Sequence, residues 1–78
     1  MTYSFTDHNG RKVNRANVVK VFKKPKESPE LKGAECMVMS VSRNDVVMLS
    51  VEKAPKNVET KRIVYVKTEN LEYLRDKP

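Results

Sequence analysis

The chain has 78 residues, which is enough for one small domain but too few to place a cofactor-binding domain beside a catalytic one. A hydrophobic content of 38% and a charged content of 33% are typical of a globular protein and argue against an intrinsically disordered chain. Sixteen Lys and Arg residues against ten Asp and Glu residues give a net charge of +6, which favours an anionic partner, most often nucleic acid.

The cysteine content and the hydropathy pattern indicate where the protein works. The single cysteine, Cys36, cannot form an internal disulfide. Small secreted domains are usually held together by several disulfides, so we expect this protein to lie in the reducing cytoplasm. Residues 1–12 contain no apolar run typical of a secretory signal, and no stretch approaches the roughly 20 apolar residues of a membrane-spanning helix. We therefore expect no membrane association.

The N-terminal residues predict a short β-hairpin. Residues 3–6 alternate aromatic and polar side chains, as a strand with one buried face does. The dipeptide Asn9-Gly10 follows, and it favours a tight hairpin turn because both residues tolerate a positive φ. Residues 11–13 can then pair back with the first strand.

The middle of the chain predicts three or more further strands. Residues 18–23 are rich in β-branched side chains, which favour a strand. Residues 24–32 contain two prolines and predict a loop, because proline donates no ladder hydrogen bond. Residues 36–42 and 46–51 are apolar, and the short polar turn between them predicts a β-hairpin at the centre of the fold. Residues 62–67 predict another strand after a second loop.

The C-terminal part completes a predicted all-β fold. Residues 69–74 are too few for an isolated helix, which needs about 12–15 residues, so we expect a 3₁₀ turn that leads into a final strand. Leu71 and Leu74 should then pack on the core. Short strands without an amphipathic helix predict a small barrel or sandwich. We assign residues 1–16 to an N-terminal hairpin extension and residues 17–75 to the core of one domain that spans the chain.

Residues 32–52 resemble a KOW motif. They begin with the basic-glycine pair Lys32-Gly33 and continue through an alternating apolar strand, a polar turn and a second strand. KOW sequences usually carry a second glycine near the position of Cys36, and this chain departs from the motif there. At the level of pattern the resemblance covers residues 17–75 and implies a five- to six-stranded SH3-like barrel with a short 3₁₀ turn near the C-terminus. It also implies binding to RNA, DNA, ribosomes or RNA polymerase, without catalysis.

The strongest charge asymmetry of the chain lies between residues 11 and 26, where seven basic side chains occur and no acidic one. Lys and Arg bind phosphates through charge and hydrogen bonds, and such contacts position a protein on a nucleic-acid backbone without reading its sequence. The other interpretation is a solvated strand edge that lysines protect against mispairing. One or two lysines suffice for that protection, so the number of basic residues favours binding.

The aromatic residues offer a second kind of contact. Phe22 lies between Lys20 and Lys24 on one face of its predicted strand, because side chains alternate along a strand. It could stack on a base while the two cations bind the flanking phosphates; the alternative is a place in the core. We expect a core position for most of the other aromatic residues, which are Tyr3, Phe5, Tyr65 and Tyr73.

Three more basic residues extend the predicted surface. Arg43 lies in the turn of the central hairpin, and Lys61 and Arg62 open a later strand. Charged residues in loops are often simply solvated, which is the alternative for these three. The predicted nucleic-acid-binding residues are therefore Arg11, Lys12, Arg15, Lys20, Phe22, Lys23, Lys24, Lys26, Arg43, Lys61 and Arg62.

No pattern in the sequence predicts catalysis, a metal or a cofactor. His8 follows Asp7 in a stretch typical of a turn, without a nucleophile beside it. A zinc site needs three or four ligands, and Cys36 is the one other soft ligand in the chain. Cys36 itself lies in an apolar strand, where a thiol behaves as a small hydrophobic group. Gly10 and Gly33 are isolated, so they do not form a phosphate-binding loop.

The sequence thus predicts a non-catalytic domain that binds RNA or DNA, without indicating which of the two. The alternative is a small basic protein-binding module or inhibitor. Such a module would dock on an acidic surface of the transcription or translation machinery, such as RNA polymerase, or of a nuclease. A positive charge that serves only solubility is a third interpretation. We expect a monomer or a weak dimer.

Overall fold

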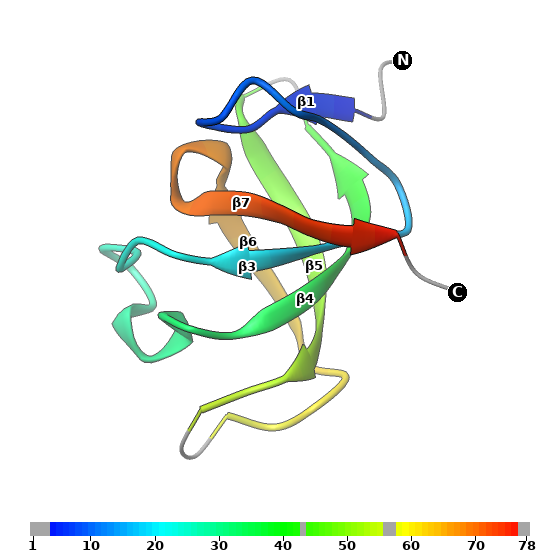
Figure 1. Cartoon of the computed structure of the whole chain (residues 1–78). Coiled ribbons are helices and arrows are strands. Elements are labelled where there is room, and N and C mark those ends of the chain that lie inside the picture. Colours follow the sequence, from blue (N-terminus) through cyan, green and yellow to red (C-terminus); the bar gives the residue numbers. More distant parts are fainter. Residues whose placement is uncertain (1–3, 43, 56–57, 77–78) are drawn as a thin grey trace.

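The computed structural model describes residues 4–42, 44–55 and 58–76, which form a small antiparallel all-β protein with seven strands and no α-helix (Figure 1). Two single-turn 3₁₀ helices, η1 and η2, interrupt the strands. The elements in chain order are β1 (Ser4–Thr6), β2 (Lys12–Asn14), β3 (Asn17–Val21), η1 (Pro29–Leu31), β4 (Glu35–Val41), β5 (Val46–Lys53), β6 (Ile63–Lys67), η2 (Thr68–Asn70) and β7 (Leu71–Asp76).

The strands form two sheets. β1 and β2 pair in a separate two-stranded sheet, whereas the other strands form one sheet in the order β6-β5-β4-β3-β7. Strands β3 to β6 are a meander, and the last strand, β7, returns to pair with the first of them, β3. Figure 1 shows β7, β3 and β4 in front of β5 and β6, so the sheet folds over on itself.

The sheet is open rather than closed. Among the described residues β6 and β7 do not pair with each other, and each is an edge strand of the five-stranded sheet. The 3₁₀ helix η2 connects β6 to β7. After η2 the chain enters β7, which pairs with β3 at the opposite edge of the sheet. The strand pattern predicted a small barrel or sandwich, and the KOW resemblance implied an SH3-like barrel; the described strands form an all-β fold but no closed barrel.

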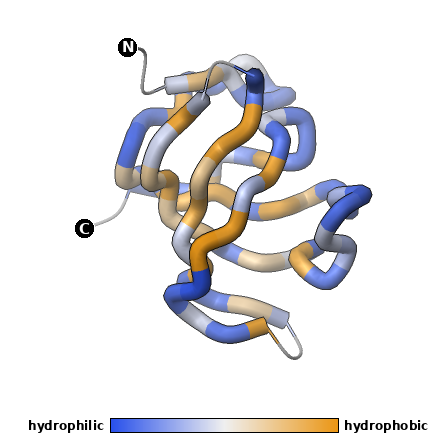
Figure 2. Tube along the Cα trace, turned by 180° about the vertical axis from the view of Figure 1, so that it is seen from behind, coloured by the Kyte–Doolittle hydropathy of each residue, from blue (hydrophilic) through white to orange (hydrophobic). Residues whose placement is uncertain are grey.

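Valine side chains fill most of the space inside the folded sheet. The alternation of β6 is regular: Val64 and Val66 are buried, whereas Ile63, Tyr65 and Lys67 are exposed. Figure 2 shows the hydrophobic stretches running along the strands, with mostly hydrophilic loops between them. The fully buried residues with the largest volume are Leu31, Leu49, Leu71, Val13, Val19, Val21, Val38, Val47, Val51 and Cys36. β-Branched residues suit such a core because they pack well on a pleated surface.

Most of the sequence-predicted strands are confirmed within a few residues, and the predicted 3₁₀ turn before the last strand is η2. The strand predicted over residues 18–23 is wrong at its end, since β3 ends at Val21. The N–H groups of Phe22 and Lys23 donate to the carbonyl oxygen of Asn70, at 3.1 and 3.5 Å, instead of continuing a ladder. The chain therefore leaves the sheet before the prolines of the following loop.

The core position predicted for Leu74 is wrong, and Tyr65 is an exception to the expectation that most aromatic residues lie in the core. Leu74 is 38% exposed, because the alternation of β7 puts it on the face opposite to buried Leu71. Tyr65 is 62% exposed, since Val64 and Val66 occupy the inner face of β6. Phe5 and Tyr73 do pack, partly buried, against the core. Tyr3 lies outside the described residues.

The carboxylate of Asp7 ties the N-terminal hairpin to the last strand of the main sheet. The side chain is 5% exposed, and its oxygens accept backbone N–H groups of Asn9 (2.9 Å), Arg11 (2.8 Å) and Tyr73 (2.8 Å). Burial by itself would raise the pKa of Asp7. The three backbone hydrogen bonds and the nearby His8 outweigh burial and hold the pKa below its ordinary value of 3.8.

We predict that Asp7→Asn lowers the free energy of unfolding at neutral pH by about 2 kcal/mol, because an amide has one accepting oxygen and would turn an NH2 group toward an N–H group that the second carboxylate oxygen now accepts. The pKa of Asp7 is lower in the folded state than in the unfolded state, so this stabilisation is present above about pH 4. It is lost as the pH falls through the folded-state pKa. Urea unfolding at pH 7 and at acidic pH measures both effects.

The matched control is Asp45→Asn. Asp45 is exposed and has a φ of 59°, a conformation that asparagine adopts readily, so its replacement should change the unfolding free energy by less than about 0.5 kcal/mol. Equal stability of the Asp7 and Asp45 variants would contradict the anchoring role of Asp7.

Candidate nucleic-acid interface

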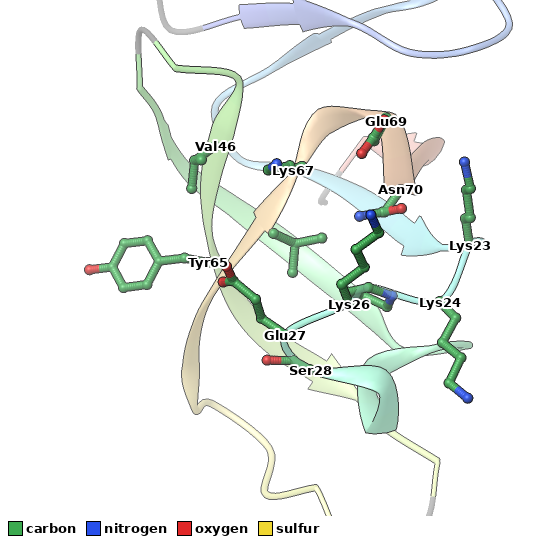
Figure 3. A pocket seen from close by; sticks show the side chains of 12 residues that line it. Lys23, Lys24, Lys26, Glu27, Ser28, Val46, Tyr65, Lys67, Glu69 and Asn70 are labelled. Atoms are coloured by element: carbon green, nitrogen blue, oxygen red, sulfur yellow. The ribbon is translucent and has the colours of Figure 1, made fainter.

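Lysine side chains from two distant parts of the chain surround a hollow of about 250 Å³ (Figure 3). Three of them come from the loop after β3, and the fourth, Lys67, comes from the end of β6. We call this site the lysine hollow. It is lined by Lys23, Lys24, Pro25, Lys26, Glu27, Ser28, Val46, Tyr65, Val66, Lys67, Glu69 and Asn70.

The loop that carries the lysines is fixed to the sheet at both of its ends. At the start, Phe22 and Lys23 donate their N–H groups to Asn70, which follows Lys67 by three residues. In the middle, the side chain of Pro25 is buried. At the end, η1 places Leu31 fully inside the core. The backbone of the loop is therefore held beside β6 and η2, and the lysine side chains extend from this anchored backbone.

Positive charge dominates the lysine hollow. Its lining has four lysines and two glutamates, which leaves an excess of two positive charges. All four lysines are exposed. Within the part of the chain that the structure describes, none of the four forms an ion pair; Arg75 and Glu35 form one there, and His8 and Glu72 form another only when the imidazole is protonated. These cations are available to an external anion.

Lys20 lies in different surroundings from the loop lysines that follow it. On β3 it stands directly opposite Glu35 of β4 on one side and Glu72 of β7 on the other. Glu35 accepts a hydrogen bond from Arg75 at 3.0 Å, and Glu72 accepts one from Asn9 at 2.9 Å. Positive and negative side chains alternate on this surface, because the three antiparallel strands place acidic and basic residues opposite each other. Lys20 does not line the lysine hollow.

The other basic residues of the predicted surface are spread over the molecule. The guanidinium of Arg11 lies over the ring of Tyr73, 4.4 Å from its centre. Lys12 is exposed on β2, and Arg15 is exposed in the turn before β3. Lys61 and Arg62 precede β6, at the end opposite to Lys67. Arg43 lies outside the described residues.

Of the predicted set, the structure thus brings together Lys23, Lys24 and Lys26, and it leaves the other described members outside the lysine hollow. The basic segment is continuous in sequence, but it passes through β2, a turn, β3 and a loop. Contiguity in sequence therefore does not make one continuous surface.

Phe22 is not free for the stacking role that its position between two lysines suggested. Its ring is half-buried, and the imidazole of His8 stacks on it with ring centres 4.1 Å apart and an angle of 22° between the planes. His8 is in turn held by Glu72, whose Oε1 lies 3.1 Å from Nε2. A face of the Phe22 ring is therefore covered by a residue of the same chain.

Tyr65 and Lys67 are site residues that the sequence reasoning missed. They lie two positions apart on the exposed face of β6. The signal was present in the sequence, because a lysine at the end of an alternating strand marks the solvent face and therefore places Tyr65 on that face. The expectation that most aromatic residues fill a small core outweighed this signal.

Cys36 is buried, and desolvation together with Glu52 and Glu35 raises the pKa of its thiol to about 12. Over residues 4–42, 44–55 and 58–76, no group of three or more His, Cys, Asp and Glu side chains could hold a metal ion. In the same ranges no helix is long and apolar enough to cross a bilayer.

No protein-family model, curated protein or solved structure matches this chain. The function of the protein is therefore inferred from the charges, contacts and exposed groups of the chain itself.

We predict that Cys36 reacts with a thiol reagent such as DTNB far more slowly in the folded protein at pH 8 than in the urea-unfolded protein. The reason is that a thiol with a pKa of about 12 is almost entirely protonated at that pH, and the side chain is also shielded. Absorbance after rapid mixing follows the reaction. Equal rates in the two states would contradict the burial of Cys36 in β4.

Proposed function

We propose that the protein is a non-catalytic nucleic-acid-binding domain whose lysine hollow holds the phosphate backbone of RNA or DNA. The observation that carries the proposal is the convergence of Lys23, Lys24, Lys26 and Lys67 from separate segments, without an ion pair to any of them in the described chain. The lining carries an excess of two positive charges, because its four lysines outnumber Glu27 and Glu69, and an excess of positive charge at one site attracts an anionic ligand.

Such a site binds phosphates through charge and the release of counterions. If each lysine of the hollow neutralises one phosphate, the logarithm of the binding constant falls against the logarithm of the salt concentration. The slope should be about −2.8 for a single strand and about −3.6 for a duplex. Contacts of this kind position the protein on the backbone and carry no sequence information directly.

The strand arrangement supports a relation to SH3-like domains of the KOW type, which is the second part of the proposal. The meander with a last strand returning beside its first, and the 3₁₀ turn before that last strand, agree with the resemblance. Gly33 has a φ of 90°, a conformation that favours glycine, at the place where the motif begins. Cys36 lies inside β4 and is not among the described residues with a positive φ, so its extended backbone does not require the second glycine.

We predict that replacing Lys23, Lys24, Lys26 and Lys67 together by Gln lowers the affinity for a nucleic-acid probe at least about tenfold at about 0.1 M salt. The salt slope should shrink by about one unit for each phosphate contact that is lost. Fluorescence anisotropy with a labelled oligonucleotide measures both quantities. Circular dichroism should stay that of the parent protein, because all four side chains are exposed.

The matched control replaces Lys12, Lys20, Lys32 and Lys53 by Gln, which removes the same charge from exposed positions outside the lysine hollow. This control should retain the salt slope, and an equal loss in both variants would show that general charge, rather than the hollow, drives binding. A parent protein that leaves all probes free would reject the proposal. If that protein then captured an acidic protein from nuclease-treated extract, a protein-docking function would replace it.

A further inference from the structure

The backbone of β6 has unpaired groups along its outer edge. Hydrogen-bonded residues alternate along an antiparallel ladder, and here Val51 N–H donates to Arg62 at 2.9 Å and Thr68 N–H donates to Asp45 at 2.8 Å. The register between β5 and β6 then points the N–H and C=O groups of Val64 and Val66 toward β5. Those of Ile63 and Tyr65 point away from the sheet.

These outward groups have no described partner. β6 is the last strand of its sheet, and no backbone hydrogen bond from Ile63 or Tyr65 to another described residue occurs on that side. Each of the two residues therefore offers a donor and an acceptor to an external ligand. A planar ligand that carries hydrogen-bond donors and acceptors could bond to these N–H and C=O groups, as a neighbouring strand would.

The side chain of Tyr65 is an exposed aromatic ring beside these groups. It is 62% exposed, and its hydroxyl donates to the sulfur of Met48, directly opposite on β5, at 3.5 Å. Figure 3 shows the ring projecting from β6 away from the loop lysines. The contact with Met48 places the tip of the ring beside β5, and a planar ligand would meet the exposed part of the ring.

We propose that the ligand of the lysine hollow is single-stranded nucleic acid, with one base stacked on the ring of Tyr65 and base edges bonded to the free backbone groups of β6. This inference rests on the proposed function and specifies its ligand. Single-strand-binding proteins combine a basic groove for the backbone with aromatic side chains that stack on bases. An unpaired base presents both a planar face and a hydrogen-bonding edge to a protein. In a duplex, the faces stack on neighbouring bases and the edges pair with the other strand.

The spacing of residues along β6 places the ring of Tyr65 close to the lysine hollow. Tyr65 and Lys67 are on the same face of the strand, so their backbones are about 6–7 Å apart. Lys67 also lines the hollow that the loop lysines surround. A chain whose phosphate meets Lys67 therefore carries its next base to the region of Tyr65, and the preceding phosphates reach Lys23, Lys24 and Lys26.

The test compares three probes: a single-stranded oligothymidylate of about twelve nucleotides, an abasic strand of that length, and a duplex of about twelve base pairs, which carries more phosphates than either strand. We expect the parent protein to bind the oligothymidylate about tenfold or more tightly than the abasic strand and the duplex. Tyr65→Val introduces a β-branched residue that suits a strand. It should remove the preference for the oligothymidylate and leave the affinities for the abasic strand and the duplex within about twofold of those of the parent protein. Tyr65→Phe should keep most of the preference, because the ring remains.

Leu74→Val is the matched control, since it alters an exposed apolar residue on the other edge strand, and it should bind all three probes as the parent does. Equal affinity of the parent for the three probes, or no effect of Tyr65→Val on the oligothymidylate, would overturn this inference. The lysine-to-glutamine variant of the hollow would still weaken every probe in that case, and the proposed function would stand. If the parent binds none of the probes, both proposals fail.

Discussion

The burial of alternating valines is the constraint on which the other features depend. In β6, the inward positions of Val64 and Val66 force Tyr65 and Lys67 to the outside, since side chains alternate along a strand. The same alternation makes β6 an ordinary core strand on its inner face and an aromatic and cationic strip on its outer face. The position of the candidate interface on this strand therefore follows from packing, before any ligand is considered.

The second requirement is that the loop after β3 lies beside this strand. The hydrogen bonds from Phe22 and Lys23 to the carbonyl of Asn70 draw the loop toward η2, and buried Pro25 keeps it there. Three lysines thereby approach a fourth that is more than forty positions away in the chain. Lys20, only three residues earlier than Lys23, remains on the sheet between two glutamates. The position of each lysine, on the sheet or on the loop after β3, decides whether it remains available to a ligand; the number of basic residues does not.

Sequence reasoning identifies the local elements well and the long-range placement poorly. The N-terminal hairpin, the central hairpin and the 3₁₀ turn before β7 could be predicted because each depends on residues close in sequence. The turn of the N-terminal hairpin is longer than the tight Asn9-Gly10 turn that was predicted, since residues 7–11 connect the two strands and only Gly10 of the pair has a positive φ. The coverage of Phe22 by His8 could not, since it depends on a contact between His8 and Glu72 across most of the chain. The open edge of the sheet could not be predicted either, because closure depends on how the whole sheet curls. Tyr65 is a different case: its exposure could have been derived from the alternation that ends at Lys67.

The most direct test of the central claim is a backbone-amide NMR titration of the parent protein with an unlabelled single-stranded oligonucleotide. The account predicts that the largest shift changes fall in residues 22–28 and 63–70, the two segments that meet at the lysine hollow. Changes concentrated in residues 11–20, with the hollow unaffected, would contradict it and would restore the N-terminal part of the basic segment as the interface. An unchanged spectrum at saturating oligonucleotide would show that nucleic acid is not the partner.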